Sequence, residues 1–106
     1  MKTLLLVDDD RQILDIYARL LKRLGYDVST AGCVKDVEQY HERDFDIAII
    51  DGLNGGCFDV LNIVKAKRKV IYSGDNRIVK EAEGLTGVEA YCRRVDLVKI
   101  LRGEEK

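Results

Sequence analysis

Several features that this sequence lacks exclude whole classes of protein before any motif is considered. It has no proline, and no apolar run approaches the roughly 20 residues of a membrane-spanning helix. Its formal net charge is only −1, so neither nucleic acid nor an anionic membrane surface is indicated as a partner. Its cysteines, Cys33, Cys57 and Cys92, form no CxxC pair and are odd in number, which argues against a disulfide framework and favours reduced thiols in the cytoplasm.

What is present fits one globular domain. The 106 residues suffice for a single core and are too few for two. Hydrophobic residues make up 46% of the chain and charged residues 35%, a composition typical of a soluble protein with well-solvated helices. We therefore expect a single domain over residues 1–106.

Strand and helix patterns alternate along the chain. The segments 4–7 and 47–50 are apolar throughout, which is typical of strands buried on both faces. Further strand patterns cover residues 27–31, 70–72 and 88–92. Apolar spacing predicts helices around residues 11–24, 34–40, 60–66, 78–83 and 97–102.

This alternation predicts a parallel sheet with helices on both faces, because parallel strands need crossover connections. Five strand–helix units favour the doubly wound, flavodoxin-like α/β fold with strand order 2-1-3-4-5. In that order the first and third strands are neighbours, and the functional crevice lies beyond their carboxyl ends.

Acidic residues follow both of these neighbouring strands. Asp8, Asp9 and Asp10 come directly after the first strand, and Asp51 ends the third. Asp10 is a good N-cap for the following helix, whereas the other three are expected to converge. Converging carboxylates repel one another unless a cation neutralises them or one stays protonated. Such all-oxygen ligands suit Mg²⁺, and a carboxylate beside Mg²⁺ can attack phosphorus to form an aspartyl phosphate.

Polar residues also follow the later strands. Ser73 ends the fourth strand with a hydroxyl that can donate to a phosphoryl oxygen, and Gly74 leaves room beside it. Arg94 lies just beyond the fifth strand and can supply positive charge to the same group. More ordinary roles stay open for both: Ser73 as a partner of a strand-end backbone group, and Arg94 with Arg93 as a solvated pair.

The segments "VDDD", "DIAIID", "VIYSG" and "GVEAYCRR" together resemble the receiver domains of two-component response regulators, over nearly the whole chain. The resemblance implies that Asp51 accepts a phosphoryl group from a histidine kinase or a phosphotransfer protein. It also implies that Asp9 and Asp51 bind Mg²⁺ directly, with Asp8 assisting and the backbone carbonyl of Leu53 completing the metal site.

The resemblance further implies that Ser73 and Tyr91 form a switch pair, with Arg94 beside the phosphoryl group. Phosphorylation would rearrange the pair and alter the binding of a downstream protein. As an alternative, Tyr91 is an ordinary half-buried aromatic residue of an edge strand. This interpretation describes a cytoplasmic signalling domain, not an enzyme, with no output domain in this chain and no contact with nucleic acid or membrane.

The chain departs from the family pattern at several positions. The family usually has lysine where this chain has Arg94, followed by a proline where this chain has Val95. A proline is also common in the loop that here contains Gly55 and Gly56. These departures bear on how a signal is transmitted more than on whether Asp51 can accept phosphate.

Two other functions compete with this interpretation. The first is a degenerate receiver that binds partners without phosphorylation. The second is a small phosphohydrolase of the haloacid dehalogenase type, whose Asp-x-Asp motif also follows the first strand. Asp8 and Asp10 have that spacing, but Gln12 stands where that family has a small hydroxyl or branched residue, and the chain has no room for a cap domain.

Overall fold

The computed structural model describes residues 1–92 and 97–102. Strands and α-helices alternate along this part of the chain, and two short 3₁₀ helices, η1 and η2, lie between them. The elements are β1 (Thr3–Val7), α1 (Arg11–Arg23), β2 (Asp27–Ala31), α2 (Val34–Val37), η1 (Glu38–Tyr40), β3 (Asp44–Asp51), η2 (Leu53–Gly55), α3 (Cys57–Ile63), β4 (Lys65–Tyr72), α4 (Asn76–Glu83), β5 (Val88–Tyr91) and α5 (Leu97–Arg102).

All five strands form one parallel sheet in the order β2-β1-β3-β4-β5, which confirms the predicted fold and strand order. β1 and β3 are neighbours, and their register pairs Val7 with Ile50. The positions that come next along the two strands therefore lie side by side. They are Asp8, which directly follows β1, and Asp51, which is the last residue of β3.

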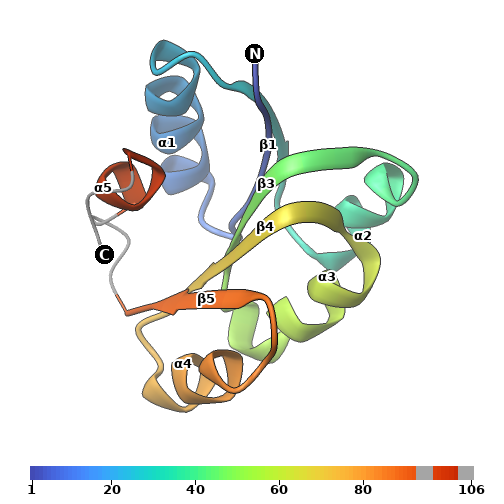
Figure 1. Cartoon of the computed structure of the whole chain (residues 1–106), viewed down its shortest axis with the longest axis vertical. Helices are drawn as coiled ribbons and strands as arrows, with labels where there is room; N and C mark the ends of the chain where they lie inside the picture. The colour runs from blue at the N-terminus through green and yellow to red at the C-terminus, as the bar shows by residue number, and fades with distance from the viewer. Residues whose placement is uncertain (93–96, 103–106) are drawn as a thin grey trace.

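Helices cover both faces of the sheet, so the apolar strands are buried from both sides (Figure 1). One core cluster packs α1 and α5 against the sheet and includes Leu6, Ile49 and Leu97. The other cluster lies under α2, α3 and α4 and includes Leu5 and Ile50. Within the described ranges, the longest helices are too short and too polar to cross a membrane.

The middle strands are longer than their apolar stretches, and one helix boundary was predicted wrongly. β3 begins at Asp44 and β4 at Lys65, so Ala66 belongs to a strand and not to a helix at 60–66. The helix in this region, α3, covers Cys57–Ile63. Lys65, Lys67 and Arg68 make the first half of β4 mostly charged, and this half pairs with β3 beyond the residues of β4 that pair with β5. A polar strand end of this kind lacks the continuous apolar run that marked the buried strands.

α1 has the start and stop signals that its sequence predicted. The Asp10 carboxylate accepts hydrogen bonds from the backbone N–H groups of Gln12 and Ile13, at 3.0 and 3.2 Å. These bonds satisfy N–H groups that have no partner within the helix. At the other end Gly25 has φ +98°, a left-handed conformation that glycine adopts without strain. Asp10 is therefore the N-cap of α1, the helix that packs against the sheet together with α5.

We expect the Asp10→Ala variant to lose about 0.5–2 kcal/mol of unfolding free energy, because the N-terminal N–H groups of α1 lose their acceptor. Urea unfolding followed by circular dichroism measures the change. Asp27→Asn serves as the control, because Asp27 is an exposed acid at the start of β2 and caps no helix. Equal stability of Asp10→Ala and the parent protein would show that the cap contributes nothing.

Candidate functional site

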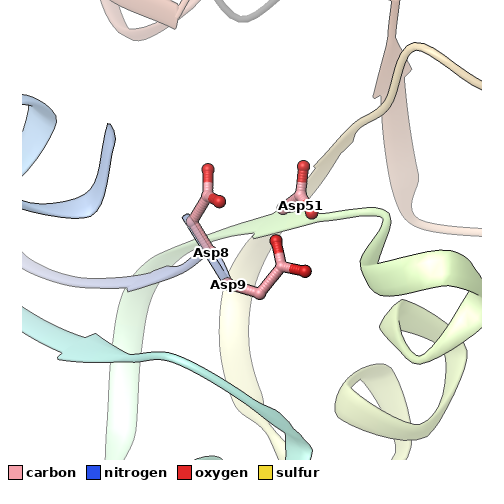
Figure 2. A group of neighbouring side chains, drawn as sticks. All are labelled: Asp8, Asp9 and Asp51. Atoms are coloured by element: carbon pink, nitrogen blue, oxygen red, sulfur yellow. The ribbon is translucent and has the colours of Figure 1, made fainter. Parts of the chain in front are cut away.

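Three carboxylates meet where β1 and β3 end. One oxygen each from Asp8, Asp9 and Asp51 can be chosen so that all three lie within 4.8 Å of one another. Figure 2 shows that the side chains leave the ends of two neighbouring strands and face the same space. Asp10, whose carboxylate caps α1, is not a member of this group. We call Asp8, Asp9 and Asp51 the acid cluster.

Asp8 is the buried member of the acid cluster, with 1% of its surface exposed. Its Oδ1 accepts a hydrogen bond of 2.9 Å from the backbone N–H of Asp10. Its Oδ2 accepts a hydrogen bond from the Tyr72 hydroxyl on β4. Donors of this kind stabilise the charged form of a carboxylate, which offsets part of the cost of burying it.

Asp51 is held by the loop that follows it. Its Oδ2 accepts a hydrogen bond of 3.1 Å from the backbone N–H of Leu53. Leu53 and Asn54 have φ of +50° and +53°, in the left-handed region that non-glycine residues seldom occupy. Such a conformation costs on the order of 1–3 kcal/mol and is typical of functional loops. The Leu53 carbonyl accepts a hydrogen bond of 3.0 Å from the N–H of Gly56, and a carbonyl oxygen has a second lone pair for another partner.

Ser73 lies at the end of β4 and lines a hollow of about 210 Å³ together with Asp51, Gly74 and Cys92. Its Oγ accepts a hydrogen bond of 3.0 Å from the backbone N–H of Asp75. This bond is the ordinary strand-end role that the sequence left open, and a hydroxyl that accepts can donate its proton at the same time.

Gly52 allows the carboxyl ends of β3 and β4 to approach each other closely. A Cβ atom at Gly52 would lie 2.7 Å from Oγ and 2.9 Å from Cβ of Ser73, both too close for any side chain. Glycine after Asp51 therefore lets Ser73 pack against the loop that holds the acid.

Tyr91 is half-buried on the α1 and α5 face of the sheet, in register with Tyr72. Its hydroxyl donates to Glu89 Oε1 at 2.9 Å. Arg68 on β4 donates to both oxygens of the same carboxylate, at 2.5 and 2.8 Å. The hydrogen bond from Arg68 is the main cause that lowers the pKa of Glu89. Burial, followed by the hydrogen bond to Glu89, raises the pKa of Tyr91.

Among the residues named from the sequence, the acid cluster and Leu53 lie together, and Ser73 shares a hollow with Asp51. Tyr91 is on the next strand, where its hydroxyl contacts Glu89. Arg94 lies outside the described residues, so its role beside a phosphoryl group stays a prediction.

Sequence reasoning missed two residues at this site. Tyr72 was assigned only to a strand, and Gly52 was given no role. The available signal was a tyrosine that directly follows Val70 and Ile71 at the end of a strand, since a buried hydroxyl usually needs a hydrogen-bond partner. No local pattern indicated that this partner would be Asp8.

The chemistry of the donor set fits a small divalent cation. The acid cluster offers only carboxylate oxygens, the ligand type that Mg²⁺ and Ca²⁺ prefer. Its members come from strand ends that the sheet fixes in place, so their approach does not depend on a flexible loop. The repulsion among them is the electrostatic cost that a bound cation would remove.

Comparison with known proteins identifies the fold. No protein-family model matches the sequence, and no curated protein matches it either. A response regulator receiver domain protein from Clostridium thermocellum is similar in structure, with a TM-score of 0.79 and 23% identity, over 97% of this chain and 93% of that chain. The chain therefore has the fold of the response regulator receiver domains.

Two further structures show that proteins with this fold differ in function. A response regulator from Burkholderia pseudomallei with a phosphorylated aspartic acid, a calcium ion and citrate has a TM-score of 0.70 and 20% identity, over 99% of this chain and 73% of that chain. A de novo designed Rossmann 2x3 fold protein has a TM-score of 0.69 and 19% identity, over 99% and 92%. Because a designed protein shares the fold, function must be argued from the site itself.

We expect the Asp9→Asn variant to melt at a higher temperature than the parent protein in the presence of a chelator, because removing one charge relieves the repulsion in the acid cluster. Differential scanning calorimetry measures the melting temperature. Asp27→Asn is the matched control, since it changes the net charge equally at the far end of the sheet. A rise of the same size in both variants would contradict the idea that the effect is local.

We expect the Glu89→Gln variant to be less stable than the parent protein at neutral pH, by less than about 1 kcal/mol, since the pair with Arg68 is a third exposed. The folded state lowers the pKa of Glu89 from its ordinary value of 4.5. The stabilisation is therefore fully present above about pH 5 and is lost as the pH falls through the lowered pKa. Melting temperatures across this range measure it, and a difference that persists unchanged at low pH would contradict the assignment.

Proposed function

We propose that this chain is a phosphoacceptor domain of the response regulator type, in which Asp51 is phosphorylated in the presence of Mg²⁺. The observation that carries the proposal is the approach of Asp8, Asp9 and Asp51 to within 4.8 Å at the ends of β1 and β3. The receiver fold supports it, since ligands bind to doubly wound sheets at this switch point. The phosphorylated aspartic acid of the Burkholderia pseudomallei protein supports it by analogy.

In this proposal Asp51 is the nucleophile. One of its carboxylate oxygens forms a bond to phosphorus, while the bond from phosphorus to the imidazole nitrogen of a phosphohistidine breaks. The donor is a histidine kinase or a phosphotransfer protein, and the proton that the imidazole nitrogen needs comes from solvent. The chain acts on no separate substrate, so it is a signalling domain and not an enzyme.

Asp9 and Asp51 would bind Mg²⁺, with Asp8 assisting and the Leu53 carbonyl as a further oxygen ligand. When bound, Mg²⁺ supplies positive charge that stabilises the oxygens of the transferred group. The Leu53 N–H holds Asp51 at the end of β3, and Ser73 lines the same hollow with a hydroxyl that can donate to a phosphoryl oxygen.

Transmission of the signal would involve Ser73 and Tyr91, because both lie at the carboxyl ends of neighbouring strands. The Ser73 N–H donates to the Tyr91 carbonyl at 3.1 Å, so the two residues are linked through their backbones. A movement of Ser73 toward a phosphoryl group would therefore also displace the backbone of Tyr91. The Tyr91 hydroxyl would have to leave Glu89 for its ring to turn, and a downstream protein would recognise the changed surface.

The anchored hydroxyl of Tyr91 also favours the competing hypothesis, a receiver that binds a partner without phosphorylation. Glu89 and Arg68 hold Tyr91 in one position, and a rigid surface can bind a partner in the absence of any switch. The two hypotheses differ in whether Asp51 is labelled.

We expect the parent protein to gain one phosphoryl group when it is incubated with Mg²⁺ and acetyl phosphate, and Asp51→Asn to gain none, because the amide lacks the nucleophilic oxygen. Intact-mass measurement and peptide mapping locate the label. Asp59→Asn is the control, since Asp59 is an exposed acid of α3, eight residues further along the chain. Labelling of Asp51→Asn at the parent level would refute the assignment, and a parent protein that is never labelled would favour the phosphorylation-independent module.

A further inference from the structure

A hydrogen bond joins Tyr72, a buried residue that the proposed chemistry does not use, to Asp8, the buried member of the acid cluster. The ring of Tyr72 belongs to the core cluster under α1 and α5, and 2% of the residue is exposed. Its hydroxyl is directed to the buried carboxylate of Asp8. The two residues are separated by 64 positions in the sequence, so the contact exists only in the folded chain.

This hydrogen bond spans the centre of the site. β3 lies between β1 and β4, and the register pairs Tyr72 with Asp51. To reach Asp8, the side chain of Tyr72 must pass across the end of β3, where Asp51 is located. The phenol therefore bridges the two outer strand ends of the site, and Asp51 lies at the strand end between them.

A phenol hydroxyl and a cation have the same electrostatic effect on Asp8. Donation of a hydrogen bond draws charge from the carboxylate and stabilises its ionised form. A cation in the acid cluster also draws charge from Asp8, so each of the two weakens the interaction of the other with that carboxylate. Two partners that stabilise the same charge are coupled unfavourably, and removing one strengthens the binding of the other.

We propose that Tyr72 is a positioning residue that holds Asp8 in the acid cluster in the absence of a cation and lowers the affinity of the cluster for that cation. The inference rests on the proposed cation site. Its consequence is a link between the cation and β4: when the cation binds, the bond from Tyr72 to Asp8 weakens. Tyr72 directly precedes Ser73, so cation binding would be transmitted to a residue that lines the same hollow as Asp51.

The test is a comparison of Tyr72→Phe with the parent protein. Phenylalanine keeps the ring in the core and removes only the hydroxyl. Titration with MgCl₂ in a calorimeter should give a dissociation constant roughly threefold to tenfold lower for Tyr72→Phe, because the Asp8 carboxylate, with one hydrogen-bond donor fewer, attracts the cation more strongly. The melting temperature in chelator should fall, and the rise on adding Mg²⁺ should be larger than in the parent protein.

Tyr40→Phe is the matched control. The Tyr40 hydroxyl also makes a partly buried hydrogen bond, of 3.0 Å, but its acceptor is the backbone carbonyl of Thr30 and not an acid. Loss of that hydroxyl should lower the melting temperature by a similar amount with and without Mg²⁺. A merely structural role of Tyr72 would give the same pattern and leave the dissociation constant unchanged.

The outcomes separate the inference from the proposed function. An unchanged or higher dissociation constant in Tyr72→Phe, beside normal Mg²⁺ binding by the parent protein, would overturn the inference and leave the cation site intact. Absence of Mg²⁺ binding by the parent protein would overturn both.

A second measurement needs no variant at position 72, and decides the question if Tyr72→Phe does not fold. In the parent protein, the ring resonances of Tyr72 should shift on addition of Mg²⁺ while those of Tyr40 stay in place. Tyr72 resonances that do not respond would overturn the inference.

Discussion

The carboxylates of Asp8, Asp9 and Asp51 repel one another where β1 and β3 end, and the hydrogen bonds around them compensate this repulsion. The register that pairs Val7 with Ile50 brings Asp8 next to Asp51, and it cannot slip by one residue without turning the apolar side chains to the opposite faces. Burial of the two strands therefore fixes the distance between the acids. Packing of the hydrophobic core therefore brings the negative charges together, and hydrogen-bond donors from the surrounding residues offset part of their repulsion.

The hydrogen-bond donors to the acid cluster come from several parts of the fold. Asp8 receives hydrogen bonds from the start of α1 and from β4, and Asp51 receives one from the loop that follows it. That loop has a left-handed backbone at Leu53 and Asn54, which costs free energy, and the stability of the packed core offsets this cost. Strain and buried charge at one edge of a well-packed sheet are typical of a functional site.

A second polar group, separate from the acid cluster, lies on β4 and β5. It consists of Arg68, Glu89 and Tyr91, and the carboxylate of Glu89 accepts hydrogen bonds from both of the others. Tyr72 and Tyr91 are in register on these two strands, yet their hydroxyls donate to carboxylates on different sides of the sheet's centre. A rearrangement near Ser73 would therefore affect both groups, because Ser73 follows Tyr72 and is bonded to the backbone of Tyr91.

The fold class, the strand order and the place where the acids gather could all be predicted from the sequence. Each of these follows from local patterns: apolar runs mark buried strands, Asp10 and Gly25 mark the ends of a helix, and parallel topology brings the ends of β1 and β3 together. The extent of β3 and β4 was harder to predict, since β3 begins with the acids Asp44 and Asp46 and the first half of β4 is mostly charged, so the apolar runs do not mark where these strands begin. Other contacts followed only from the folded structure: the hydrogen bonds of Tyr72 to Asp8 and of Arg68 to Glu89, and the close approach of Gly52 to Ser73. They join residues that lie far apart in the sequence, and they depend on register and side-chain direction, which no local pattern encodes.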